Sequence, residues 1–237
     1  MPIYQLLEDV FLFPPPSHAE PEGLLAVGGD LSTERLLCAY EQGIFPWYEE
    51  GQPILWWTPD PRMILEPTRL KVSRSLRKVL RKKTFQIKTD TAFAHVIRAC
   101  AQVRLRDKKG TWITPEMEKS YIRLHELGYA HSVESWYDGN LVGGLYGIFM
   151  GKCFFGESMF TEKTDASKIA FVSLVEQMKN WGVDLIDCQV SSMHLKSLGA
   201  HEVKREEFLR RLQAAMRFPT KPQKWTENQF DLLQFQT

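Results

Sequence analysis

Residues 130–160 read AHSVESWYDGNLVGGLYGIFMGKCFFGESMF, a stretch of β-branched and aromatic residues that is interrupted by turn residues. This pattern predicts three antiparallel strands joined by two tight turns. Asp138-Gly139-Asn140 supplies the first turn, because Asp-Gly accepts the backbone angles of a short hairpin, and Gly151 supplies the second. The expected strands are Ala130–Tyr137, Leu141–Met150 and Lys152–Phe160.

A helix and a buried strand are expected after this meander. Ala166–Trp181 has the pattern of a helix, and Leu185–Val190 is a short apolar run typical of a buried strand. Three antiparallel strands, a helix and a further strand form the core order of GCN5-related N-acetyltransferases, although many α+β domains share this order. The expected fold class is α+β, with an acetyltransferase-like (GNAT-like) mixed sheet flanked by helices.

The first part of the chain has a different composition. Residues 1–62 are rich in proline and aromatic residues, and one helix is expected there, from a cap at Ser32 or Thr33 to about Gly43. We expect a small N-terminal α/β domain over residues 1–62 and the GNAT-like domain over residues 63–237, with the boundary at Asp60-Pro61. Other expected elements are a strand at Phe85–Thr89, a polar loop at residues 104–110, and helices at Val72–Lys83, Ala92–Val103, Pro115–Leu127 and Glu206–Arg217.

Composition limits the compartment and the cofactors. The 237 residues carry a formal net charge of +1, and 43% of them are hydrophobic, which is ordinary for a globular protein. The N-terminus lacks the basic segment with which a signal peptide begins. No stretch of the sequence approaches the roughly 18 consecutive apolar residues of a membrane span. The four cysteines include no CxxC pair, so we expect a cytoplasmic protein with reduced thiols. Cys188, His194 and His201 have no recognised ligand spacing, and no metal is expected.

Every charged residue between Pro67 and Thr89 is positive. A solvated helix face is the usual explanation of a charge run, but here no acidic residue accompanies the bases. Such segregation indicates a phosphate-bearing partner and favours contact with nucleic acid. The candidate nucleic-acid-binding residues in this stretch are Arg74, Arg77, Lys78, Arg81 and Lys82.

Polar residues interrupt two apolar segments. Asp187 and Gln189 lie at positions i and i+2 of the expected buried strand, which would point both side chains to one face. Glu157 follows Gly156 near the end of another expected strand. A buried carboxylate and amide must be paired, so these residues mark either a structural network or a functional site, and their pattern favours neither.

Several longer motifs resemble those of the leucyl/phenylalanyl-tRNA–protein transferase family. They occur in the order and spacing of that family, and the similarity runs from about residue 10 to about residue 215. The motifs are GLLAVGGD (23–30), YEQGIFPW (40–47), WWTPDPR (56–62), GTWIT (110–114), GESMF (156–160), LIDCQ (185–189) and HLKSLGA (194–200).

The resemblance implies an enzyme that transfers leucine or phenylalanine from its tRNA to a protein whose first residue is lysine or arginine, creating a degradation signal. Aminolysis of an already activated ester needs no cofactor, but it needs two oriented substrates and a deprotonated amine. We expect Asp187 to be the main electrostatic and proton-handling group and Gln189 to hold the amine or the ester. Glu157 is expected to bind the cationic first residue of the acceptor.

The resemblance also implies the residues that bind the donor. Leu145, Phe154, Leu174 and Ile186 are candidates for an apolar pocket that takes the leucine or phenylalanine side chain, although each alone is better explained as core. Around the terminal adenosine and the ester we expect Tyr40, Trp47, Trp112 and Tyr121, and Ser158 is a further candidate for substrate contact.

Two other functions remain open from the sequence. A coenzyme A-dependent acyltransferase shares the expected fold, but its pyrophosphate-binding loop is rich in glycine, whereas residues 158–167 contain no glycine and two acidic residues. A non-catalytic tRNA-binding protein would account for the basic stretch alone. A monomer is expected in each case.

Overall fold

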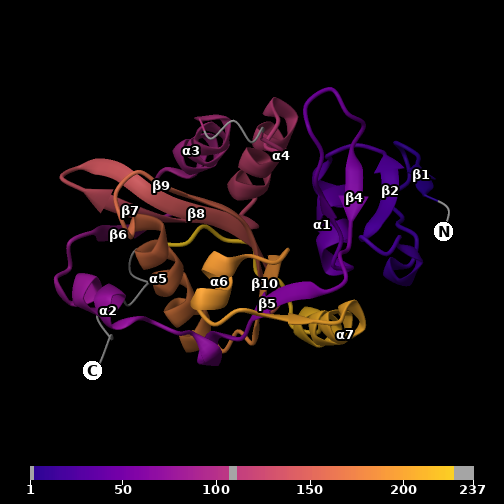
Figure 1. The fold of residues 1–237 in the computed structure, drawn as a ribbon. Helices are drawn as coiled ribbons and strands as arrows, with labels where there is room; N and C mark the ends of the chain where they lie inside the picture. The colour runs from indigo at the N-terminus through magenta and orange to yellow at the C-terminus, as the bar shows by residue number, and fades with distance from the viewer. Residues whose placement is uncertain (1–2, 107–110, 227–237) are drawn as a thin grey trace.

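The computed structural model describes residues 3–106 and 111–226 and contains, within these residues, two β-sheets with flanking helices (Figure 1). The smaller sheet has the strand order β1-β2-β4-β3, and helix α1, Thr33–Glu41, belongs to the same part of the chain. Ser32 caps the start of α1, because its hydroxyl accepts a hydrogen bond from the Arg35 backbone N–H. Its strands are short: β1 Tyr4–Leu6, β2 Leu24–Gly28, β3 Phe45–Pro46 and β4 Leu55–Trp57. The N-terminal region therefore contains short strands and one α-helix.

The larger sheet has the strand order β11-β5-β10-β9-β8-β7-β6. Its centre is the predicted meander, and β10 pairs in parallel with β9, while the other neighbouring strands pair antiparallel. Asp138 and Gly139 both adopt positive φ at the first hairpin, as a tight turn there requires. The bounds are β5 Arg62–Leu65, β6 Gln86–Thr89, β7 Ala130–Tyr137, β8 Asn140–Met150, β9 Cys153–Thr161, β10 Leu185–Gln189 and β11 His201–Val203.

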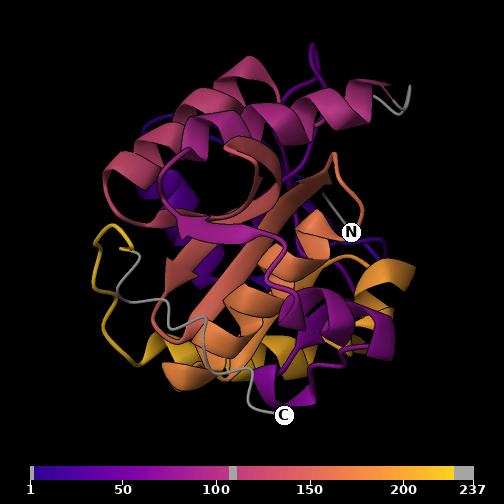
Figure 2. The ribbon, with the colours of Figure 1, turned by 90° about the vertical axis from the view of Figure 1, so that its left-hand side faces the viewer.

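Helices cover both faces of the larger sheet (Figures 1 and 2). Helices α3, Phe93–Arg106, and α4, Pro115–Glu126, pack on one face, and α5, Ala166–Asn180, packs on the other with α2, Arg74–Arg81, against it. The core under α3 and α4 continues into the smaller sheet through Tyr40. The remaining helices are α6, Met193–Ser197, and α7, Arg205–Met216, with 3-10 turns at Pro16–His18 and Pro67–Arg69.

Most of the expected elements are confirmed, with shifted ends. The expected polar loop is wrong at its start, because α3 continues to Arg106, and residues 107–110 lie outside the described residues. Lys82 and Lys83 lie beyond α2, where Lys83 adopts positive φ and ends the helix. The strand β9 continues to Thr161, so the loop before α5 is shorter than expected.

Three short elements are absent from the sequence predictions: β5, α6 and β11. Each has at most five residues, which is too few for a periodic pattern to establish. Two of them, β5 and α6, help to form the site described below. Among the described residues, every helix is too short or too polar to span a bilayer.

Candidate active site

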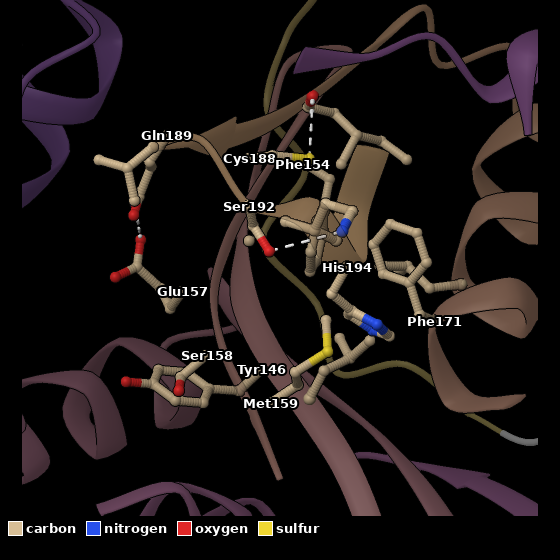
Figure 3. A pocket seen from close by; sticks show the side chains of 16 residues that line it. Tyr146, Phe154, Glu157, Ser158, Met159, Phe171, Cys188, Gln189, Ser192 and His194 are labelled. Carbon is tan, nitrogen blue, oxygen red and sulfur yellow. Dashed lines mark hydrogen bonds between the residues drawn. The ribbon is translucent and has the colours of Figure 1, made fainter. Parts of the chain in front are cut away.

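A cavity of about 240 Å³ lies between the larger sheet, α5 and the start of α6. Its walls are mainly apolar, and the Glu157–Gln189 pair lies at one end (Figure 3). Figure 3 shows Glu157 and Gln189 facing each other at that end, whereas Phe171, Met159 and His194 lie at the other. Such a cavity can enclose one apolar side chain and hold a polar reacting group at its mouth.

All four residues predicted for an apolar pocket line this cavity, namely Leu145, Phe154, Leu174 and Ile186. Ser158 lines it too. The sequence reasoning missed Met159 and Phe171. Phe171 precedes Leu174 by three positions on α5, so the helical spacing puts both on one face and could have indicated it.

Glu157 is the centre of the polar end. Its Oε1 accepts hydrogen bonds from the Tyr40 hydroxyl and from the Gln189 side-chain amide, both at 2.8 Å. Its Oε2 accepts a hydrogen bond of 3.3 Å from the Tyr121 hydroxyl, and the two tyrosine hydroxyls also contact each other. Two helices of different parts of the chain, α1 and α4, thus bring a tyrosine each to one carboxylate.

The surroundings of Glu157 raise its pKa from 4.5 to about 7. Burial is the largest cause, because the charged carboxylate loses water, and the nearby negative charge of Asp187 acts in the same direction. Hydrogen bonds from Tyr40, Tyr121 and Gln189 favour the charged form and oppose the rise. A carboxyl group with a pKa near 7 can both release and accept a proton at neutral pH.

Asp187 points away from the cavity and is fully buried. Its two oxygens form a bidentate pair with Arg62 of β5, at 2.8 and 2.7 Å, and Oδ1 also accepts the backbone N–H of Gln189. The prediction that Asp187 and Gln189 point to one face of the strand is wrong, because a register shift separates them and Gln189 adopts a φ of +60°. The side-chain amide of Gln189 therefore contacts Glu157 and not Asp187.

Arg62 itself was missed as a site residue. It is 1% exposed and lies between the rings of Phe45 and Phe208, with its guanidinium carbon 4.8 and 4.5 Å from their centroids. The available sequence signal was its place at the end of the WWTPDPR motif, next to an otherwise apolar strand. A buried arginine in such a position needs a buried acid as its partner.

A smaller hollow of about 60 Å³ adjoins the cavity. It shares Glu157, Gln189 and Val190 with the cavity, and its other walls are Phe45, Pro46, Trp47 and Trp112. Trp47 is 40% exposed and Trp112 is almost buried. Glu157 and Gln189 thus lie where the apolar cavity and the aromatic hollow meet. This arrangement suits two substrate groups held against each other.

The basic residues of α2 lie on the protein surface. Leu76 faces the core, and the predicted tRNA-binding residues are exposed: Arg74, Arg77, Lys78, Arg81 and Lys82. Helix α2 packs against α5, which also supplies Phe171 and Leu174 to the cavity. Over the ranges that the structure describes, no three His, Cys, Asp or Glu side chains are grouped to hold a metal ion.

Comparisons with known proteins agree with the motifs. The family described as leucyl/phenylalanyl-tRNA protein transferase matches residues 64–213, and the N-terminal domain of the same family matches residues 29–60. A leucyl/phenylalanyl-tRNA–protein transferase of Syntrophobacter fumaroxidans is 61% identical over 88% of this chain and 89% of its own length. A protein of the same name from Nitrosospira multiformis is 58% identical over 90% and 93%.

Among solved structures, that of L-PGS from Bacillus licheniformis has a TM-score of 0.41 and 13% identity, and covers 71% of this chain and 54% of its own. That likeness is too low to support an argument about the site. The two family matches together include α1, β3 and β4 of the smaller sheet, most of the larger sheet and the Glu157–Gln189 pair. This chain therefore belongs to the leucyl/phenylalanyl-tRNA protein transferase family.

Proposed function

We propose that this chain transfers leucine or phenylalanine from aminoacyl-tRNA to the N-terminal amine of a protein that begins with lysine or arginine. The observation that carries the proposal is the apolar cavity that ends at the Glu157–Gln189 pair. The family to which the chain belongs supports the same reaction. Both substrates are made or used where proteins are synthesised, so we also propose that the enzyme is cytoplasmic. We further propose that it acts as a monomer.

The donor side chain would enter the cavity. Its inner walls are Leu145, Phe154, Leu174 and Ile186, which offer contact with an apolar group and no hydrogen bonds to a polar one. The ester would then lie at the mouth, beside Gln189. The terminal adenosine would occupy the hollow between Trp47 and Trp112, where stacking contributes roughly 1–3 kcal/mol per base.

The acceptor amine would approach the Glu157–Gln189 pair. An α-ammonium group has a pKa of about 8, and the Glu157 carboxyl group has a pKa of about 7. The two groups therefore have similar proton affinities, and the Glu157 carboxylate can take a proton from the ammonium. The neutral amine attacks the ester carbonyl carbon, the carbon–oxygen bond to the ribose breaks, and Glu157 gives its proton to the ribose oxygen. The attacking nitrogen then releases its remaining extra proton to the Glu157 carboxylate, from which it passes to solvent, and the amide is formed. The negative charge of Glu157 also favours a cationic first residue.

Asp187 would support this chemistry from behind the cavity. Its proton-handling role stays a prediction, and its contacts favour a positioning role, because Arg62 and the Gln189 N–H already occupy its oxygens. The bidentate pair holds the Gln189 backbone in its positive-φ conformation and directs the side-chain amide toward Glu157. The exposed bases of α2 would contact tRNA phosphates, which carry affinity without reading sequence.

We also propose an acetyltransferase-like architecture for residues 63–237, with residues 1–62 as a separate small domain. The sheet order supports it, since the meander β7-β8-β9 is followed by α5 and by β10, parallel to β9. The loop Glu162–Asp165 between β9 and α5 has no glycine to approach a pyrophosphate. This loop disfavours coenzyme A as the donor.

The test uses purified protein, radiolabelled Leu-tRNA and two model proteins that differ only in an N-terminal Lys or Ala. Label is counted in acid-precipitated protein after the remaining tRNA ester has been hydrolysed. The proposal expects label on the Lys protein and not on the Ala protein. Binding of tRNA without transfer would instead identify a non-catalytic tRNA-binding protein, and transfer from acetyl-coenzyme A would identify an acyltransferase.

A further inference from the structure

The C-terminal strap, residues 217–226, crosses one end of the larger sheet after α7. Three hydrogen bonds, each with a backbone N–H as donor, fix it to three different turns. The Gly151 N–H donates to the Thr220 hydroxyl at 3.0 Å, the Gln223 N–H donates to the Gly128 carbonyl at 3.2 Å, and the Trp225 N–H donates to Asp90 at 2.8 Å. Figure 2 shows this yellow segment leaving α7 and running along the outside of the sheet.

The strap ends in a buried aromatic side chain. Trp225 is 4% exposed, and its indole stacks on the ring of His131, with 3.9 Å between the ring centroids. Its other aromatic neighbours include Trp181 and Phe154, at 5.3 and 6.1 Å between centroids. Trp225 thus fills space inside the core cluster on the α5 side of the sheet.

Phe154 separates Trp225 from the cavity. The ring of Phe154 lines the cavity wall, and it also lies over Gly147 of β8. A Cβ atom at Gly147 would stand 2.5 Å from the Phe154 ring, so the sheet blocks the ring on that side. Phe154 therefore contacts both Gly147 and Trp225, and Trp225 itself does not line the cavity.

We infer that Trp225 of the C-terminal strap is a specificity-determining residue that sets the depth of the cavity by holding Phe154 in place. This inference rests on the proposed function, in which the cavity takes the donor side chain. A smaller residue at position 225 leaves space behind Phe154, into which the ring can retreat. The deeper cavity then favours phenylalanine over leucine as the donor side chain, because selection in an apolar pocket depends on fit.

The test compares wild-type protein with Trp225→Leu and Trp225→Phe. The ratio of kcat/KM for Phe-tRNA to that for Leu-tRNA is measured with one acceptor protein, and thermal unfolding is followed in parallel. Trp225→Leu is expected to raise the ratio on the order of tenfold, the scale on which apolar pockets discriminate, and Trp225→Phe to raise it less. Ile97→Ala is the matched control, because Ile97 is fully buried in the other core cluster and does not line the cavity.

Loss of packing alone would lower Tm and leave the ratio unchanged, as expected for the Ile97→Ala control. A folded Trp225→Leu protein with the wild-type ratio overturns the inference. If Trp225→Leu does not fold, Trp225→Phe and Gly128→Ala carry the test. A Cβ at Gly128 would stand 2.5 Å from the Gln223 nitrogen and so displaces the strap without changing Trp225.

A second readout separates this inference from the proposed function. Binding of leucinamide and phenylalaninamide to each variant is followed by NMR, and the ratio of the two Kd values needs no transfer step. A wild-type protein that transfers neither amino acid refutes the proposed function. The inference about Trp225 still stands if Trp225→Leu shifts the binding ratio toward phenylalaninamide, and falls if it does not.

Discussion

Glu157→Gln removes one charge from the site and keeps the shape of the side chain. The amide oxygen of the new residue can still accept hydrogen bonds from Tyr40 and Gln189, as Oε1 of Glu157 does. The amide nitrogen can donate to the Tyr121 hydroxyl, which donates to Oε2 in the wild type. The substitution therefore tests the carboxylate itself and not the surrounding contacts.

We expect Glu157→Gln to stabilise the protein at high pH. Folding raises the pKa of this carboxyl group. The folded state therefore loses stability as the pH rises from the pKa of the group in the unfolded chain to its pKa in the folded protein. A rise from 4.5 to about 7 corresponds to about 3 kcal/mol above pH 7, which is an upper bound because the side chain is partly open to the cavity. The variant has no such loss, so its advantage in unfolding free energy grows between about pH 4.5 and pH 7.

We expect the same change to lower activity. Removing a group that accepts a proton typically costs between about a hundredfold and ten-thousandfold in rate. In the wild type, kcat/KM should rise with pH through about 7, because the base must be ionised, and the ratio of wild type to variant should reach a plateau above that pH. If Glu157 only binds the cationic acceptor, the variant raises KM and leaves kcat unchanged.

Urea unfolding at pH 5 and at pH 8 measures the stability effect, and steady-state transfer between pH 6 and pH 9 measures the activity. A difference in unfolding free energy that is the same at both pH values would refute the reasoning about burial. A variant with wild-type kcat at every pH would refute the role of Glu157 as proton acceptor. The two results are independent, so either part of the reasoning can fail alone.

Three further predictions concern the supporting residues. Arg62→Met should cost about 3–5 kcal/mol in urea unfolding, because it leaves Asp187 buried without its partner, and a cost below about 1 kcal/mol would contradict the pairing. Tyr121→Phe removes a hydrogen bond that favours ionised Glu157, so the rise of kcat/KM should move to higher pH, and an unchanged or lower midpoint would speak against it. The third prediction concerns three exposed bases of α2, Arg74, Lys78 and Arg81. Neutralising all three should weaken tRNA binding and reduce the slope of log K against log salt by about 2, without changing kcat at saturating tRNA. An unchanged slope would place the tRNA elsewhere.

The sequence by itself determined the features that depend on neighbouring residues. Asp138-Gly139 and Gly151 require particular backbone angles, so both hairpins of the meander could be predicted from them. Ser32, Ser73 and Thr114 cap their helices through a side chain that reaches three residues along the chain. The motifs also indicated the family, and with it the apolar residues that line the cavity.

Only the tertiary structure decided which side chains meet in the site. Tyr40 contacts Glu157 across 117 positions of sequence, and Arg62 contacts Asp187 across 125. These contacts depend on the lateral order and register of the strands, above all on β5 beside β10, which no local pattern specifies. The bulge that turns Gln189 from Asp187 toward Glu157 has the same origin, because a strand of five residues takes its register from its neighbours and not from its own side chains.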